Sequence, residues 1–105
     1  MHKEYDKLIR DRIPEIIESQ GKKCKIEKMD EDEFSIYLKK KLKEEVDEFQ
    51  ESGEIHEIVD IYEVILAILD TKDISLEEFE EIRQNKASER GRFEENLKLL
   101  EVRDD

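Results

Sequence analysis

Hydrophobic residues recur at helical spacing through the middle of the chain. Between about residues 31 and 51 they return every three to four positions, as on one face of an α-helix. The residues on that face are Phe34, Leu38, Leu42 and Phe49. From about residue 54 to residue 70 they cover more than half of the helix circumference, as in a helix with several packing neighbours. Because a chain this short supplies few neighbours, we expect a subunit interface; a small monomeric bundle around this helix is the alternative.

Capping residues predict where the long helices begin and end. Asp30 with Glu33, and Ser75 with Glu78, have the spacing of a capping box at a helix N-terminus. Gly53 is the turn signal inside the central apolar stretch. The long helices are therefore expected over about residues 31–51, 54–70 and 76–89.

The remaining segments are shorter and less regular. Pro14 suits the first turn of a short helix that Gly21 ends. Residues 22–29 predict an extended connector, with one short strand as the alternative. After Gly91 we expect a tail that packs through Phe93, Leu97, Leu100 and Val102. The whole pattern predicts an all-α fold with a central antiparallel helical hairpin, in one domain over residues 1–105.

Four carboxylates are predicted to meet across the turn at Gly53. Glu48 precedes Gly53 by five positions and Glu57 follows it by four, while Glu45 precedes it by eight and Asp60 follows it by seven. In an antiparallel hairpin each pair lies at nearly one height, offset by about 1.5 Å, the rise of one residue. Glu45 also falls within the apolar stripe, where a carboxylate loses solvation and needs a cation or a proton.

Oxygen ligands of this kind favour Mg²⁺, with Mn²⁺ or Ca²⁺ as alternatives. Because acids are abundant in this chain, a set of ordinary solvated carboxylates is the other interpretation of the same pattern. His56 shares a side with Asp60 and could reach the site, although a solvated histidine is the simpler expectation.

Composition excludes several classes of partner. The chain has 31 acidic and 19 basic residues and a formal net charge of -12, which argues against a polymeric nucleic acid as the ligand. Cys24 is the single cysteine, so no internal disulfide can form, as is usual in a reducing compartment. We find neither an apolar run long enough to span a membrane nor a signal-peptide core, and therefore expect a cytoplasmic protein without membrane association.

The acidic pattern resembles that of a known enzyme superfamily. EEVDE (residues 44–48) followed by EIVD (residues 57–60) resembles the EExxE…ExxD signature of MazG-like all-α nucleotide pyrophosphohydrolases. The opening YDKLIRDRIPEIIESQGKK (residues 5–23) and the ending KASERGRFEENLKLLEV (residues 86–102) resemble its phosphoribosyl-ATP pyrophosphohydrolase-like branch. The resemblance covers nearly the whole chain, with a departure at Arg92, where the branch more usually has a second glycine.

This resemblance implies a four-helix-type bundle completed in a homodimer or homotetramer. It implies hydrolysis of a nucleoside triphosphate between the α- and β-phosphates, with Mg²⁺ or Mn²⁺ as the cofactor. The implied metal ligands are Glu45, Glu48, Glu57 and Asp60. The implied catalytic residues are Glu44, Glu45 and Glu48, of which Glu44 or Glu48 would accept the proton of the attacking water. The basic residues expected to hold the phosphates are Lys86, Arg90, Lys7, Arg10 and Arg12; pairing with neighbouring acids is their alternative role.

The expected substrates are non-standard or surplus nucleotides, and phosphoribosyl-ATP is the alternative substrate. A non-catalytic helical interaction module, with acids that only keep it soluble, is the alternative from another functional class.

Overall fold

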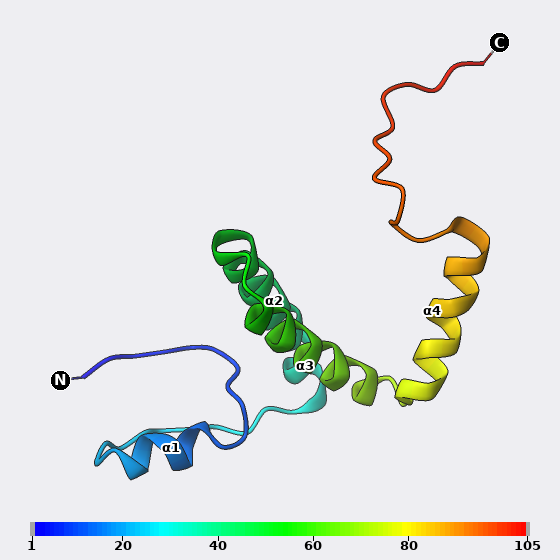
Figure 1. The fold of residues 1–105 in the computed structure, drawn as a ribbon. Helices are drawn as coiled ribbons and strands as arrows, with labels where there is room; N and C mark the ends of the chain where they lie inside the picture. Colours follow the sequence, from blue (N-terminus) through cyan, green and yellow to red (C-terminus); the bar gives the residue numbers. More distant parts are fainter. Residues whose placement is uncertain (1, 105) are drawn as a thin grey trace. The chain divides into compact units, whose positions relative to one another are not determined.

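The computed structural model describes residues 2–104, which contain four helices and no strand (Figure 1). The helices are α1 (Ile13–Ser19), α2 (Glu31–Ser52), α3 (Ile55–Thr71) and α4 (Leu76–Arg90). The predicted all-α class is confirmed, and the three long helices agree with their predicted bounds to within one residue at each end. Residues 22–29 are an irregular connector, so the alternative of a strand there is wrong.

Local hydrogen bonds explain these boundaries. The Asp30 carboxylate accepts the Glu33 N–H at 2.9 Å, and the Ser75 hydroxyl accepts the Glu78 N–H at 3.1 Å. Gly53 adopts the left-handed conformation, with φ 66° and ψ 11°, and its N–H donates to the Phe49 carbonyl at 2.7 Å. A left-handed residue at this position is characteristic of a helix C-terminus, and glycine adopts it without steric strain. The predicted caps and the predicted turn are therefore confirmed.

The chain divides into two compact units, one extending to Ile74 and the other beginning at Ser75. In the first unit, α2 and α3 pack against each other as a hairpin joined by Gly53 and Glu54. Its buried apolar side chains are Leu38, Val64 and Leu69. The predicted antiparallel helical hairpin is therefore present. The four-helix-type bundle around it stays a prediction.

The hairpin leaves apolar side chains of α3 exposed to solvent. They are Ile55, Ile58, Val59 and Tyr62, with exposed fractions between 38% and 77%. Exposure of this many large apolar side chains on one helix is typical of a surface that meets a partner. The predicted subunit interface stays a prediction.

The irregular segment before α1 is tied to the hairpin. The Tyr37 hydroxyl of α2 donates to the Asp6 carboxylate at 2.6 Å, and this hydrogen bond raises the pKa of Tyr37. Leu8 and Ile9 are half-buried. The segment therefore has both polar and apolar contacts that hold it against the hairpin.

The second unit consists of α4 and an irregular tail. No residue of α4 is buried, and the tail has no helix within its described residues, up to residue 104. Phe93 is fully exposed, and the other apolar residues expected to pack are also exposed: Leu97, Leu100 and Val102. Asn96 has a positive φ of 55°, which interrupts the helical spacing of these residues. Within the second unit, the tail therefore does not pack through these side chains as expected.

Among residues 2–104, no helix combines the length and the apolar character that crossing a membrane requires. The acidic residues predicted as metal ligands all belong to the first unit, so the candidate site lies there. The prediction of a single domain over residues 1–105 stays a prediction.

Candidate metal centre

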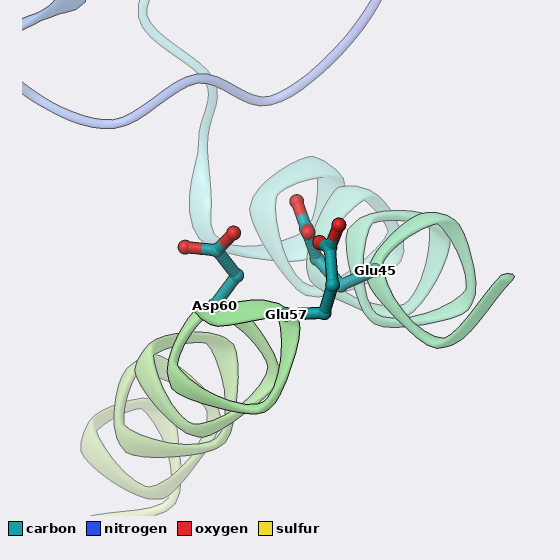
Figure 2. A group of neighbouring side chains, drawn as sticks. All are labelled: Glu45, Glu57 and Asp60. Atoms are coloured by element: carbon teal, nitrogen blue, oxygen red, sulfur yellow. The ribbon is translucent and has the colours of Figure 1, made fainter. Parts of the chain in front are cut away.

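Three of the four predicted metal ligands converge between α2 and α3 (Figure 2). Glu45 comes from α2, and Glu57 and Asp60 come from α3. One carboxylate oxygen from each lies within 4.8 Å of the other two. Glu57 and Asp60 are three residues apart and therefore share a side of their helix. We call Glu45, Glu57 and Asp60 the acidic triad.

Glu45 is the buried member of the acidic triad. Only 6% of the residue is exposed, as its place in the apolar stripe predicts. Its Oε1 lies 3.3 Å from the Lys41 ammonium, but its Oε2 is buried and has no hydrogen-bond partner. Burial raises the pKa of Glu45, the hydrogen bond from Lys41 opposes that shift, and the negative charge of Glu48 adds to it. A buried acceptor without a partner is costly, so this oxygen lacks a cation or a donor.

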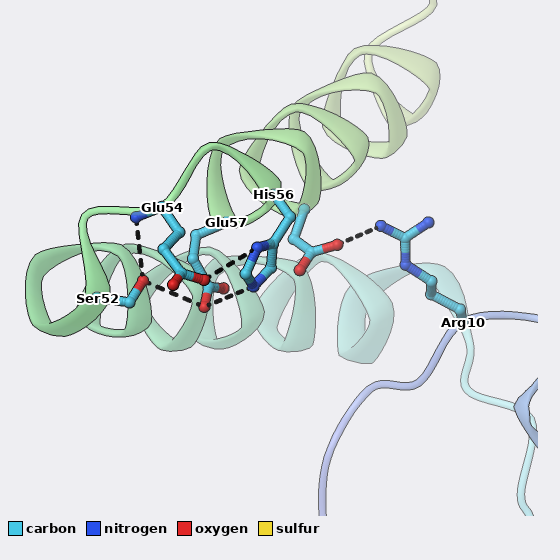
Figure 3. Close-up of polar contacts among 6 residues, drawn as sticks. Arg10, Ser52, Glu54, His56 and Glu57 are labelled. Carbon is cyan, nitrogen blue, oxygen red and sulfur yellow. Dashed lines mark hydrogen bonds and ion pairs between the residues drawn. The ribbon is translucent and has the colours of Figure 1, made fainter.

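Glu57 lies at the start of α3, close to the turn (Figure 3). Its Oε1 accepts a hydrogen bond from the Ser52 hydroxyl at 3.4 Å and lies 3.4 Å from Nε2 of His56. Nδ1 of His56 lies 3.2 Å from the Glu54 carboxylate. His56 therefore reaches the acidic triad through Glu57, which sequence spacing only suggested.

Asp60 is bound by a residue from outside the hairpin. The Arg10 guanidinium donates from Nη2 to Asp60 Oδ1 at 2.8 Å (Figure 3). Its Nη1 lies 3.8 Å from the Glu63 carboxylate. Arg10 was expected to hold substrate phosphates. In this structure it neutralises a carboxylate of the acidic triad, which was the alternative role for the basic residues.

Glu44 and Glu48 lie beside the acidic triad and outside it. Glu48 is exposed, and it is close enough to Glu45 to raise the pKa of that residue. The Glu44 carboxylate lies 3.5 Å from Lys41. Both acids border a shallow hollow whose lining residues all belong to α2. Their predicted roles as ligand or proton acceptor stay predictions.

Lys41 is the site residue that sequence reasoning missed. Its side chain is 16% exposed, and it pairs with both Glu44 and Glu45. The signal was present, because Lys41 precedes Glu45 by four residues and residues at that spacing meet on one helix face.

The other basic residues predicted to bind phosphate have varied surroundings. Arg12 pairs with Glu15 at 3.2 Å, and the Lys7 ammonium lies 5.5 Å from the centre of the Tyr5 ring. Lys86 and Arg90 belong to α4, in the second unit. Their roles as phosphate ligands stay predictions.

A cleft of about 560 Å³ lies beside the acidic triad, between the segment before α1 and the hairpin. Its polar lining includes Arg10, Arg12, Lys41, Glu45 and Asp60. Apolar side chains such as Phe34, Leu38 and Val64 line the rest. This volume lies within the range of small-molecule sites. Eight of the fifteen lining residues are charged, so the cleft is more polar than most such sites.

Comparison of the chain with protein-family models, with curated proteins and with solved structures returned no match. The chemistry of the site therefore carries the functional argument. The acidic triad offers only oxygen donors, and one of them is buried without a partner. These residues fit a hard divalent cation.

Proposed function

We propose that this protein is a Mg²⁺-dependent nucleoside triphosphate pyrophosphohydrolase, which cleaves between the α- and β-phosphates to give a monophosphate and pyrophosphate. The observation that carries the proposal is the buried, unpartnered Oε2 of Glu45 next to carboxylates of a second helix. The resemblance of the acidic pattern to MazG-like pyrophosphohydrolases supplies the reaction.

Glu45, Glu57 and Asp60 would hold the cation, with Glu48 beside Glu45 as a further ligand. A divalent cation bound there would neutralise phosphate charge and lower the pKa of a bound water. Mn²⁺ offers the same preference for oxygen ligands and is the expected substitute.

The remaining polar residues have roles that follow from their charge. Glu44 or Glu48, whichever carboxylate the cation does not fully engage, would accept the proton of the attacking water. Arg10, Arg12 and Lys7 would hold the phosphates from the N-terminal side, and Lys86 and Arg90 are further candidates for the same role. Positive side chains at these positions stabilise the negative charge that develops during phosphoryl transfer.

The proposed substrates are non-standard or surplus nucleotides, with phosphoribosyl-ATP as the alternative within the same reaction class. Both contain the phosphoanhydride that the reaction breaks. A substrate panel that measures pyrophosphate release distinguishes them.

We also propose that the exposed apolar face of α3 packs against a second copy of the chain. Few apolar side chains are buried in the hairpin, and Ile55 and Val59 are more than half exposed. Burial of such side chains stabilises an interface. The same surface is what favours the other functional class, an interaction module that binds a different protein.

The test is pyrophosphate release from a panel of canonical and modified nucleoside triphosphates and phosphoribosyl-ATP, with Mg²⁺ present. Glu45→Gln and Asp60→Asn should each lower the rate by more than about 100-fold, since loss of a ligand exceeds the effect of outer-shell substitutions. Asp47→Asn is the matched control, because Asp47 is an exposed acid of α2 that pairs with Lys43 at 2.8 Å.

The control variant should keep the wild-type rate, and all three variants should keep the helical circular dichroism signal. Absence of turnover on the whole panel, or an active Glu45→Gln variant, would contradict the enzymatic proposal and favour the interaction module.

A further inference from the structure

Arg10 has a distinctive position among the charged residues of the first unit. Of residues 2–104, it is the one cation from outside α2 and α3 that forms an ion pair with the acidic triad. Lys41 and His56 also contact the acidic triad, but each belongs to the helix whose acid it meets. The charge on Asp60 is thus balanced by the irregular segment before α1.

Two hydrogen bonds that lie apart in the sequence hold this segment to the hairpin, and Arg10 also lies 3.8 Å from the Glu63 carboxylate of α3. Asp6 accepts the hydrogen bond from Tyr37 of α2, and Arg10 donates to Asp60 of α3. Leu8 and Ile9, between them, line the cleft. Loss of the Arg10 contact would therefore leave the segment attached through Asp6 and Tyr37, free to move at its other end.

The pair between Arg10 and Asp60 is accessible to exchange. The Arg10 side chain is 51% exposed and that of Asp60 is 35% exposed. Ion pairs of this exposure contribute little to stability, so replacing one partner by another cation is readily achieved. The guanidinium carries a fixed positive charge and has no means of losing it.

A divalent cation on the acidic triad and a guanidinium on Asp60 repel each other at close range. The Asp60 carboxylate has two oxygens, so it could bind the metal ion through one and Arg10 through the other. The two positive charges would still be separated by only one carboxylate group. Occupation of Asp60 by Arg10 consequently lowers the affinity of the acidic triad for a divalent cation. Phosphate groups entering the cleft would remove this conflict by giving Arg10 another anion.

We propose that Arg10 is an internal counter-ion that competes with the divalent cation for Asp60, and that it moves to a phosphate group when metal and nucleotide bind together. This inference rests on the proposed function, because it concerns the same acidic triad. The N-terminal segment would then couple the two ligands: bound nucleotide would raise the affinity of the protein for the divalent cation, and the bound cation would raise its affinity for nucleotide.

The first experiment measures Mn²⁺ affinity in the absence of nucleotide, from the paramagnetic resonance signal of the free ion. Arg10→Ala should bind Mn²⁺ about tenfold more tightly than the wild type, the Coulomb effect of one nearby unit charge on a divalent ion in water-like surroundings. Lys43→Ala is the control, because it removes one positive charge of the first unit from a side chain that is 78% exposed and pairs with Asp47. Its affinity should equal that of the wild type.

Equal affinities of wild type and Arg10→Ala would overturn the inference, and so would an equal gain in both variants, which would indicate a general effect of net charge. A wild type that releases pyrophosphate while Arg10→Ala shows unchanged Mn²⁺ affinity would refute the inference alone. An active Glu45→Gln variant would refute the proposed function instead. The two failures are therefore distinguishable.

The second experiment detects release of the segment directly, by tryptic cleavage after Lys7, Arg10 and Arg12. Addition of Mn²⁺ to the wild type should accelerate cleavage there, because the contact with Asp60 is lost. In Glu45→Gln, which lacks a ligand, Mn²⁺ should have no effect at the same concentration. Slower cleavage of the wild type in Mn²⁺ would mean that the cation tightens the segment, contrary to the competition proposed.

Discussion

The helices α3 and α4 have similar lengths, 17 and 15 residues, but different sources of stability. In the first unit, α3 packs on α2 and buries Val64 and Leu69. In the second unit, no residue of α4 is buried, and its local support includes the Ser75 cap and the pairing of Arg83 with Glu80. Arg83 lowers the pKa of Glu80 through these hydrogen bonds.

The difference shows why the candidate site is located on the hairpin. A carboxylate such as Glu45 is desolvated only where two elements pack, and α2 and α3 provide such a seam. Helices of about 12–15 residues are marginal in water without tertiary contacts. We therefore expect α4 to need a further surface, which the proposed second copy of the chain could provide.

The largest expected difference between the two helical units concerns core packing. Leu38→Ala should lower the free energy of unfolding by about 2–5 kcal/mol, because Leu38 is the most buried side chain of the hairpin. Leu76→Ala makes the same change at an exposed position of α4 and should alter the free energy of unfolding by about 0.5 kcal/mol or less. Urea unfolding monitored by circular dichroism measures both. Equal effects would show that α4 is packed as closely as the hairpin.

A smaller effect is expected from removing the buried charge. Without metal at neutral pH, Glu45→Gln should raise the free energy of unfolding by about 1–2 kcal/mol, since it replaces a buried charged oxygen without a partner by an amide N–H that can donate to the neighbouring carboxylates of Glu57 and Asp60. Added Mg²⁺ should stabilise the wild type and not the variant, because the ion binds the folded state. Asp47→Asn, at an exposed position, is the control.

The pH dependence of this difference has a definite sign. Because burial raises the pKa of Glu45, the folded chain binds the proton more tightly than the unfolded chain does. Stability of the wild type therefore falls as pH rises from the unfolded pKa through the raised folded pKa. The advantage of Glu45→Gln should be full above that window and disappear below it. Thermal melts across this pH range would detect the trend, and an advantage independent of pH would contradict it.

The smallest effect is expected from replacing the two capping residues. The consequence should differ between α4 and α2. Ser75→Ala and Asp30→Ala should each cost about 1 kcal/mol. In α4 that loss should reduce the helical signal at room temperature, since no residue of α4 is buried. In α2 it should lower the unfolding midpoint and leave the native signal unchanged. Amide hydrogen exchange at the first turn of each helix would locate the loss.

The sequence predicted what depends on local spacing. Caps at Asp30 and Ser75 and the turn at Gly53 set the helix bounds, and the height of the acids across that turn predicted the meeting of Glu45, Glu57 and Asp60. These features follow from the regular geometry of the α-helix, so the spacing of residues in one sequence is enough to predict them.

What the sequence could not predict depends on irregular segments. The pairing of Arg10 with Asp60 spans 50 positions and requires the path of the segment before α1. The tail after Gly91 is irregular up to residue 104, and the positive φ of Asn96 is not helical, so the apolar spacing there did not predict a packed element. The pairing of Lys41 with Glu45 could have been predicted from their spacing of four residues. The burial of the pair could not.

The connection at Gly53 makes the candidate site sensitive to chain length. Only Gly53 and Glu54 separate the two long helices. One inserted residue, continued into α3, would turn that helix by about 100° relative to its partner, since an α-helix has 3.6 residues per turn. Glu57 and Asp60 would then face away from Glu45 while every side chain was still present. Whether these three carboxylates can bind one ion therefore depends on the length of a two-residue connection.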